Sequence, residues 1–220
     1  MGEISRGILG GFSGSVGTVV GATFRTKDIM KAKPRKSSKQ AVQSQLDQRA
    51  KFELVTELLS HASTFIAEGF KPSSVFVTPM NEAVSYHLTQ AIKGVSPNFS
   101  MDLSKVKFSN GKDGGLLNPK MVATPEVSMK ISWSPDGASD FGPNNKNRDR
   151  TTDVGRVAIL NMSTGNFLFA DGMLRSAGSA DLTMPPPFAG STVHGWIYFV
   201  SLDGKHISST DYLGSIVAID

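Results

Sequence analysis

The chain contains no cysteine, and this absence removes several kinds of chemistry at once. A chain without thiols forms no disulfide framework, offers no thiolate ligand to zinc and has no cysteine nucleophile. Its 220 residues are 39% hydrophobic, which is enough to bury one good core or two modest ones. We therefore expect one or two domains that are stabilised by packing.

Catalytic motifs are also lacking. The nearest approach to a nucleophile elbow is Gly11-Phe12-Ser13-Gly14, which lacks the residue between the serine and the second glycine. No phosphate-binding loop or dinucleotide fingerprint follows an expected strand. The histidines have no short metal-ligand spacing, and we expect packing roles for all of them: His61, His87, His194 and His206. The sequence therefore predicts a protein that is not an enzyme and that binds no metal or cofactor.

Long apolar runs are absent as well. A spanning helix needs about 20 strongly apolar residues. The closest segment, residues 7–24, is uncharged but rich in glycine and hydroxyl side chains. It also lacks the compact apolar stretch and the cleavage site of a signal peptide. We expect no membrane span, and we expect this segment to belong to the mature protein.

The glycine-rich opening, residues 1–39, is predicted to be an arm that needs a partner surface. Glycines spaced by three and four would form a smooth stripe along a helix, whereas an extended chain would use its valines and Phe24 to contact a neighbour. The sequence leaves both conformations open. The candidate interaction residues are Gly10, Gly11, Phe12, Gly14, Val16, Gly17, Val19, Val20, Gly21 and Phe24.

Positive charge is concentrated at the end of this arm, although the whole chain carries only +4. The candidate anion-binding residues are Arg25, Lys27, Lys31, Lys33, Arg35, Lys36 and Lys39. Such a stretch can meet phosphate, an anionic membrane surface or an acidic protein patch, and a solvated connector is the plainer interpretation. Phe24 is the one aromatic residue close to it, so little base stacking is on offer.

Residues 40–99 are predicted to form two amphipathic helices. Apolar residues recur at helical spacing over residues 40–68, which indicates one long helix. A second helix is expected to begin with Thr78 as its N-cap and Pro79 at its first position, and to stop at Gly94.

Residues 100–220 change to the period of strands. Val127, Met129, Ile131 and Trp133 alternate with polar residues, as in a half-buried strand. The other expected strands are 105–109, 156–161, 167–170, 180–184, 193–201, 205–208 and 215–219. Asp203-Gly204 is a type I′ hairpin signal. The predicted fold class is α+β: a glycine-rich N-terminal arm and two amphipathic helices, followed by a C-terminal antiparallel immunoglobulin-like β-sandwich.

One long connection, residues 134–153, interrupts the strands and is expected to be either functional or mobile. Its carboxylates do not have the spacing of an EF-hand, and neighbouring basic residues offset their charge. A solvated polar loop is the favoured interpretation. The residues concerned are Asp136, Asp140, Lys146, Arg148, Asp149, Arg150 and Asp153.

Several segments together resemble an uncharacterised protein family common in Bacteroidota, filed as a domain of unknown function (DUF6266). They are the glycine-rich run 10–21, the helical segment 45–52, Phe188-Ala189-Gly190 and Tyr212-Leu213-Gly214. The resemblance spans nearly the whole chain. It implies a bacterial source and a two-part layout, and it brings no activity, cofactor or catalytic residue. Synthesis in the bacterial cytoplasm without a conventional signal peptide is the corresponding expectation, with release inside a particle left open.

Three functions follow from this sequence as hypotheses. The first is a non-enzymatic structural or interaction protein that associates with itself or with protein partners, or that is a component or cargo of a phage-like particle such as a contractile injection system. The second is a sequence-independent nucleic-acid-binding protein that uses residues 25–39. The third is a carbohydrate-binding sandwich module that uses Trp133, Trp196 or Tyr198, although we expect these rings to lie in the core.

Overall fold

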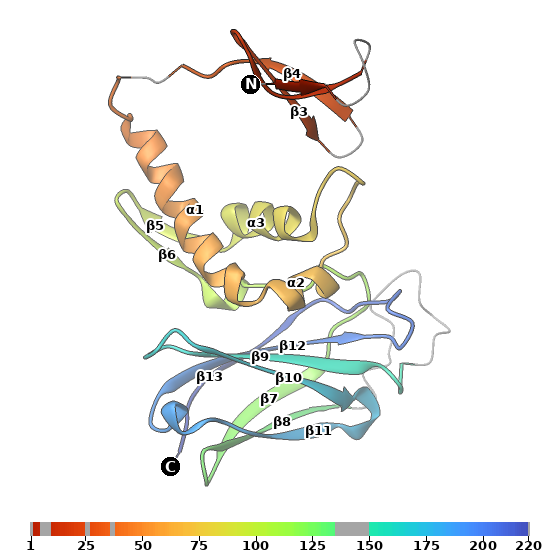
Figure 1. Cartoon of the computed structure of the whole chain (residues 1–220). Coiled ribbons are helices and arrows are strands. Elements are labelled where there is room, and N and C mark those ends of the chain that lie inside the picture. The colour runs from red at the N-terminus through yellow and green to blue at the C-terminus, as the bar shows by residue number, and fades with distance from the viewer. Residues whose placement is uncertain (1, 5–9, 25–26, 36–37, 135–149, 220) are drawn as a thin grey trace. The chain divides into compact units, whose positions relative to one another are not determined.

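The computed structural model describes residues 2–4, 10–24, 27–35, 38–134 and 150–219 (Figure 1). The chain divides into two compact units, Met1–Gln43 and Ser44–Asp220. This division differs from the three expected regions 1–39, 40–99 and 100–220. The helices and the β-sandwich share one unit because they share a hydrophobic core.

The first unit is a small antiparallel sheet. Its strands, in spatial order, are β1 (Gly2–Ile4), β2 (Phe12–Val16), β3 (Val19–Phe24) and β4 (Lys27–Ala32). The glycine-rich segment is therefore extended, and the helical alternative is wrong. Gly17 lies at the first position of the two-residue loop that joins β2 to β3, with φ of +57°, which is the geometry of a type II′ hairpin.

Three α-helices open the second unit: α1 (Gln43–His61), α2 (Ser63–Gly69) and α3 (Pro79–Gln90). The single long helix expected over residues 40–68 is interrupted at Ala62, where φ is −107° and ψ is 23°. The Ala62 N–H bonds to the Leu59 carbonyl at 3.1 Å, three residues back rather than four, so the last turn of α1 is tightened. Ala62 is buried at this break.

The start of α3 agrees with its prediction, whereas its end does not. Thr78 Oγ1 accepts the N–H of Asn81 at 3.2 Å, and Pro79 is the first helical residue. The helix ends at Gln90 and not at Gly94. Gly94 has φ of +96° and lies in a hairpin that the sequence did not predict, formed by β5 (Ile92–Val95) and β6 (Asn98–Met101).

Two antiparallel sheets form the expected β-sandwich. One sheet has the order β10 (Phe167–Leu174), β9 (Val154–Asn161), β12 (Thr192–Val200) and β13 (Asp211–Val217). The other has the order β11 (Ser179–Thr183), β8 (Ser128–Ser134) and β7 (Leu117–Thr124). Three single 3₁₀ turns complete the elements: η1 (Leu103–Lys105), η2 (Arg175–Ala177) and η3 (Pro186–Phe188).

Two expected strands, 105–109 and 205–208, are not regular strands. Lys105 ends a 3₁₀ turn, and Ile207 forms only an isolated bridge with Val200. A turn is present here, but its central residues are Leu202 and Asp203, because the Gly204 N–H bonds to the Ser201 carbonyl at 2.8 Å. It is not of type I′: Gly204 has φ of +66°, whereas Asp203 is not among the residues with positive φ.

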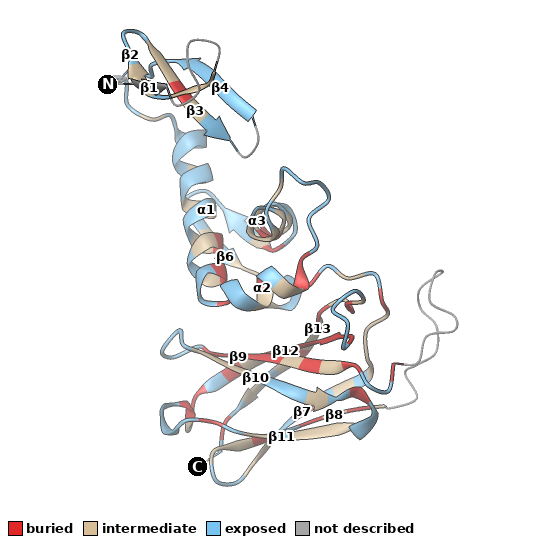
Figure 2. Ribbon diagram, turned by 45° about the vertical axis from the view of Figure 1, so that its right-hand side comes forward, coloured by how far each residue is buried: buried red, intermediate tan, exposed pale blue. Residues whose placement is uncertain are grey.

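The sheet that contains β9 and β12 lies between the helices and the other sheet (Figures 1 and 2), and it packs against both through apolar side chains. Ile197 and Phe199 of β12 face the other sheet, in a core that includes Trp133 of β8. Trp196 and Tyr198, on the opposite face, pack beneath the helices. β9 and β12 are therefore buried along most of their length on both faces, as the burial patterns of their residues show.

Candidate interaction surface

The strand register of the small sheet defines which side chains share a face. Directly opposite residues of an antiparallel pair project to the same face, and successive residues of one strand alternate between faces. β3 and β4 keep a single register, in which Val20 lies opposite Lys31. The hydrogen bond from Thr23 Oγ1 to Asp28 Oδ1, 2.8 Å long, joins another opposite pair. Two chemically different faces result.

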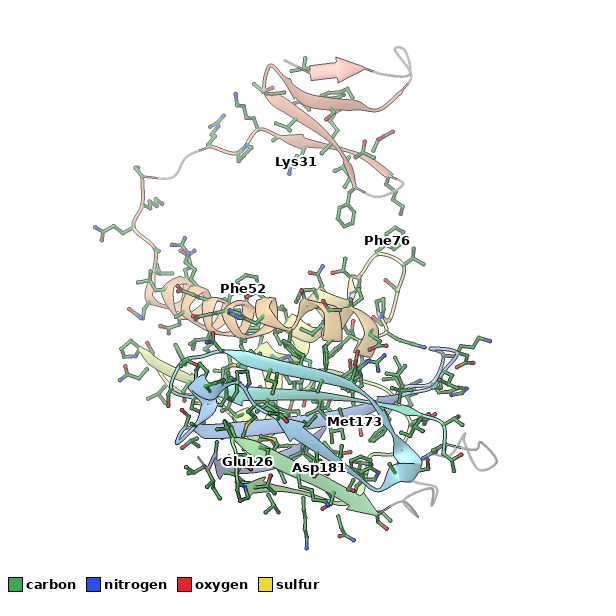
Figure 3. All side chains as sticks on the ribbon, turned by 60° about the horizontal axis from the view of Figure 1, so that its bottom comes forward. Lys31, Phe52, Phe76, Glu126, Met173 and Asp181 are labelled. Atoms are coloured by element: carbon green, nitrogen blue, oxygen red, sulfur yellow. The ribbon has the colours of Figure 1, made fainter. Side chains whose placement is uncertain are left out.

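The first of these, here named the lysine face, mixes cationic and apolar side chains. Its members on β3 and β4 are Val20, Ala22, Phe24, Lys27, Ile29 and Lys31, and Ser15 of β2 lies opposite Val20 on the same face. Phe24 is 53% exposed and Ile29 is 42% exposed, and Lys31 is labelled in Figure 3. The backbone N–H of Lys33 donates to the Thr18 carbonyl at 2.8 Å, so the chain beyond β4 stays beside β3, and the alternation gives Lys33 the parity of the lysine face.

The second face, here named the apolar face, carries Phe12, Val16, Val19, Gly21, Met30 and Ala32, with the hydrogen-bonded pair Thr23 and Asp28 at one end. The Phe12 ring covers Gly21, where a Cβ atom would lie 2.6 Å from a ring carbon. Glycine is thus required at this position by the close approach of β2. Met30 is 68% exposed and Val16 is 53% exposed, so most of this apolar surface is not covered within the unit.

The small sheet has almost no core of its own. Gly21 is the one buried residue among residues 10–24 and 27–35, and every residue of β4 is exposed. A sheet of this size needs a covered hydrophobic face to be stable in water. The expectation that this segment needs a partner surface therefore still applies, but the segment is a folded sheet with an uncovered apolar face instead of an unstructured arm.

The predicted interaction residues and the predicted cationic residues come together only in part. The interaction residues lie in β2, β3, their hairpin and the two glycines before β2. Lys27, Lys31 and Lys33 share one face, whereas Arg35 and Lys39 lie beyond the sheet, and all five are exposed. Arg25 and Lys36 lie outside the described residues. The sequence alone did not reveal this shared face, because it arises only when residues 27–32 form a strand in which alternate side chains point the same way.

The four histidines occupy separate places, and His87 is buried. Its Nδ1–H donates to the Ala83 carbonyl at 2.7 Å, and its Nε2 accepts the N–H of Lys107 at 3.1 Å. The neutral ring is therefore fully bonded, and burial lowers the pKa of His87. In the part of the chain that the structure describes, no three histidine or carboxylate side chains gather as metal ligands would.

The aromatic residues considered for carbohydrate binding are core residues. Trp133, Trp196 and Tyr198 are each exposed by 4% or less. The Trp133 Nε1–H donates to the Arg175 carbonyl at 2.8 Å, and the Trp196 Nε1–H donates to the Leu103 carbonyl at 3.1 Å. Rings that are covered and bonded in this way cannot stack on a sugar, so the expectation of core roles is confirmed.

The long connection can be compared with its prediction only at its end. Residues 135–149, which include Asp136, Asp140, Lys146, Arg148 and Asp149, lie outside the described residues. Arg150 and Asp153 are both only 2% exposed, so the interpretation of a solvated loop is wrong for these two. The N–H of Asp153 bonds to the Arg150 carbonyl at 3.1 Å, and the Asp153 carbonyl accepts the N–H of Arg175 at 2.9 Å. These bonds tie the end of the connection to η2.

An apolar pocket of about 380 Å³ opens between α1, β6 and the turn after β9. Its lining includes Leu54, Leu58, Phe99, Met101, Leu160 and Phe167. Glu57, His61, Ser100 and Asn161 add polar side chains to the wall. Asn161 is engaged already, because it accepts the Ser163 N–H at 2.8 Å and donates to the Pro187 carbonyl at 3.0 Å. The pocket can supply apolar contact, and Asn161 is not free to orient a ligand.

Comparison with known proteins places the chain in a family. The model of the "Family of unknown function (DUF6266)" matches residues 11–214. The chain belongs to this family. The DUF6266 match spans both units, so the small sheet and the helix-covered sandwich occur together within the family's boundaries. No curated protein matches the chain.

Among solved structures, two fibronectin-type domains are similar to part of this DUF6266 chain. A domain of the human collagen alpha-1(XX) chain has 13% identity and a TM-score of 0.35, with 51% of this chain and 90% of that chain covered. The FN5 domain of Drosophila Lar has 9% identity and a TM-score of 0.32, with 49% and 97% covered. No described helix is both long enough and apolar enough to cross a bilayer.

Proposed function

We propose that this protein is a non-enzymatic structural or interaction protein that docks onto another protein chain through the small sheet of residues 2–32. The observation that carries the proposal is the sheet's missing core: Met30, Val16 and Phe24 are at least half exposed, and Gly21 alone is buried among residues 10–24 and 27–35. Apolar surface of this kind gains free energy when a partner covers it. The partner is either a second copy or a different protein.

The larger unit supports the role of a scaffold in this proposal. Its two cores lie on either side of one sheet, and the helices are fixed to that sheet by packed side chains. A unit with two packed cores is itself rigid, and it can act as a scaffold that carries a small docking domain. The further expectation, that docking takes place inside a phage-like particle such as a contractile injection system, stays a prediction that electron microscopy of the native protein tests.

Site-specific photo-crosslinking in the cells that make the protein tests the docking function. A photoreactive residue replaces Val16 on the apolar face, and the matched control carries the same residue at Lys120, which is exposed on β7. We expect a protein adduct from position 16 that position 120 does not give. Equal, background labelling from both positions would contradict the proposal. Mass spectrometry of the adduct separates a second copy from another protein.

Sequence-independent nucleic-acid binding is a second candidate, favoured by one observation. The register brings Lys27 and Lys31 onto the same face as the exposed ring of Phe24, a combination that can hold a phosphate backbone and one stacked base. A salt titration of binding to duplex and single-stranded DNA tests it. Binding that is undetectable even at low salt would remove this candidate.

A further inference from the structure

The small sheet ends in a strand edge that is suited to strand addition. β4 is the last strand in the order β1-β2-β3-β4, and no strand among the described residues pairs with its outer edge. All six of its residues are exposed. An edge strand presents backbone N–H and C=O groups that can pair with another extended chain. The chemistry of the β4 side chains decides which chain can add there.

A second copy of β4 fits poorly at this edge. Two identical antiparallel edges are related by a twofold axis normal to the sheet, which pairs odd-numbered residues with odd-numbered ones. With the axis at Ile29, each Lys27 lies opposite a Lys31. With the axis at Met30, each Lys27 lies opposite a Lys33. Like charges directly opposite each other are destabilising, so the lysines protect the edge against pairing with itself.

The same register defines a complementary partner. Lys27, Lys31 and Lys33 favour acidic residues opposite them, Ile29 favours an apolar residue, and Asp28 on the other face favours a cation. Because all three lysines belong to one face, the acidic residues of the partner strand must also alternate onto one face. Charge complementarity and apolar contact then act in a single register.

We propose that β4 binds an extended acidic segment of another protein as a fifth, antiparallel strand, with its carboxylates on the lysine face. This inference rests on the proposed docking function and specifies its partner. The added strand supplies a backbone ladder along the edge, and its side chains lie beside those of Ile29 and Met30 on the two faces of β4. Nucleic acid can contact the lysines through its phosphates, but it offers no backbone amide groups that could pair with the edge of β4.

Peptide binding to the full-length protein tests the proposal. The probe is a fluorescently labelled peptide with blocked ends, Glu-Thr-Glu-Val-Val-Lys-Glu, designed to lie opposite residues 33 to 27. We expect saturable binding in fluorescence anisotropy, together with slower amide exchange in residues 27–32. Lys31→Glu should weaken binding about fivefold, because it turns one cross-strand attraction into a repulsion. Lys130→Glu, the same charge change at an exposed position on β8, should leave binding unchanged.

Backbone methylation separates strand addition from charge attraction alone. One version of the peptide is N-methylated at residues 2, 4 and 6, and the other at residues 3, 5 and 7, so that only one version loses the amides that face β4. We expect one version to bind like the parent peptide and the other not to bind. Equal binding of both versions would overturn the proposal, and so would equal effects of Lys31→Glu and Lys130→Glu.

A competition experiment decides between a protein strand and nucleic acid. Displacement of the labelled peptide by single-stranded DNA at lower concentration than by the unlabelled peptide would assign the lysine face to nucleic acid and overturn the proposal. A peptide that fails to bind, combined with a protein adduct from position 16 in cells, would overturn the acidic strand while leaving the docking function intact. Failure of both experiments would overturn both.

Discussion

Arg156 on β9 donates two hydrogen bonds to the carboxylate of Glu68 on α2, from Nε at 2.8 Å and from Nη2 at 2.9 Å. The Tyr198 hydroxyl of β12 donates to the Phe65 carbonyl beside this pair, at 3.1 Å. The bond to Glu68 raises the pKa of Arg156, and burial raises that of Tyr198. The helical layer is thus joined to the sheet by a paired, two-pronged ionic contact as well as by apolar packing.

Glu68→Gln should lower the free energy of unfolding by about 1.5–3 kcal/mol, because it leaves the Arg156 guanidinium without its charged acceptor. Chemical denaturation followed by tryptophan fluorescence measures this change. Glu57→Gln on the exposed side of α1 is the matched control and should change little. If Glu68→Gln and Glu57→Gln have equally small effects, the Arg156–Glu68 pair makes no net contribution to the free energy of unfolding.

Leu59→Ala should destabilise the protein by about 2–5 kcal/mol, because Leu59 is fully buried between α1 and the sheet and its loss leaves a cavity. Leu46→Ala, on the same helix at a position that is 45% exposed, should cost far less. Thermal unfolding of the two variants beside the parent protein gives the comparison. If the two substitutions cost the same, α1 is not packed on the sheet as described.

Stability should fall as the pH drops below about 6.5, the ordinary pKa of histidine. Burial, followed by the nearby positive charge of Lys107, lowers the pKa of His87 in the folded state. Below pH 6.5 the unfolded chain therefore binds a proton that the folded chain does not, and the loss continues until the pH reaches the lowered pKa. Denaturation midpoints measured across this range test the prediction.

The control for this pH dependence is His87→Gln, which removes the titrating ring. This variant should be less stable than the parent near neutral pH and should lose less stability on acidification. His194 also has a pKa lowered by burial and remains in the variant, so some pH dependence should persist. Parallel curves for parent and variant would exclude His87 as a source.

Gly17→Val should weaken the β2–β3 hairpin, because a β-branched side chain is strained at a φ of +57°. Gly17→Asn is the matched control: asparagine tolerates positive φ, and apart from Gly17 and its two chain neighbours no atom lies within 4 Å of the position that a Cβ would take. Amide exchange of residues 12–24 by mass spectrometry should speed up in the valine variant and change much less in the asparagine variant. Similar exchange in both would count against the type II′ turn.

The parts of the fold that could be predicted are those fixed by local chemistry. Thr78 and Pro79 mark the start of α3 because a hydroxyl cap and a preset φ act within one turn. The alternation around Ile131 reveals β8 because one face of this strand is buried. Gly17-Thr18 forms the β2–β3 turn, but the sequence left the conformation open because glycines spaced by three and four also fit a helical stripe.

The parts that failed depend on contacts far along the chain. The break at Ala62 lets α2 pack against the sheet, and no glycine or proline in the neighbouring sequence marks this break. β7 contains Pro119 and an Asn118 with φ of +50°, and its register shifts between Leu117 and Lys120, so it has no readable alternation. The lysine face needed the pairing of β3 with β4, which charge counting along the sequence does not provide.

The sheet of β9 and β12 has a consequence for how the larger unit can be divided. Side chains on one face of this sheet belong to the core shared with the helices, and those on the opposite face belong to the core between the two sheets. Removing the helices would expose Trp196 and Tyr198 to water. Removing the other sheet would expose Ile197 and Phe199. Either fragment would therefore present a large apolar surface to the solvent. The body of residues 44–220 should consequently melt in one transition, and a protease that cuts inside it should yield aggregates in place of two soluble halves.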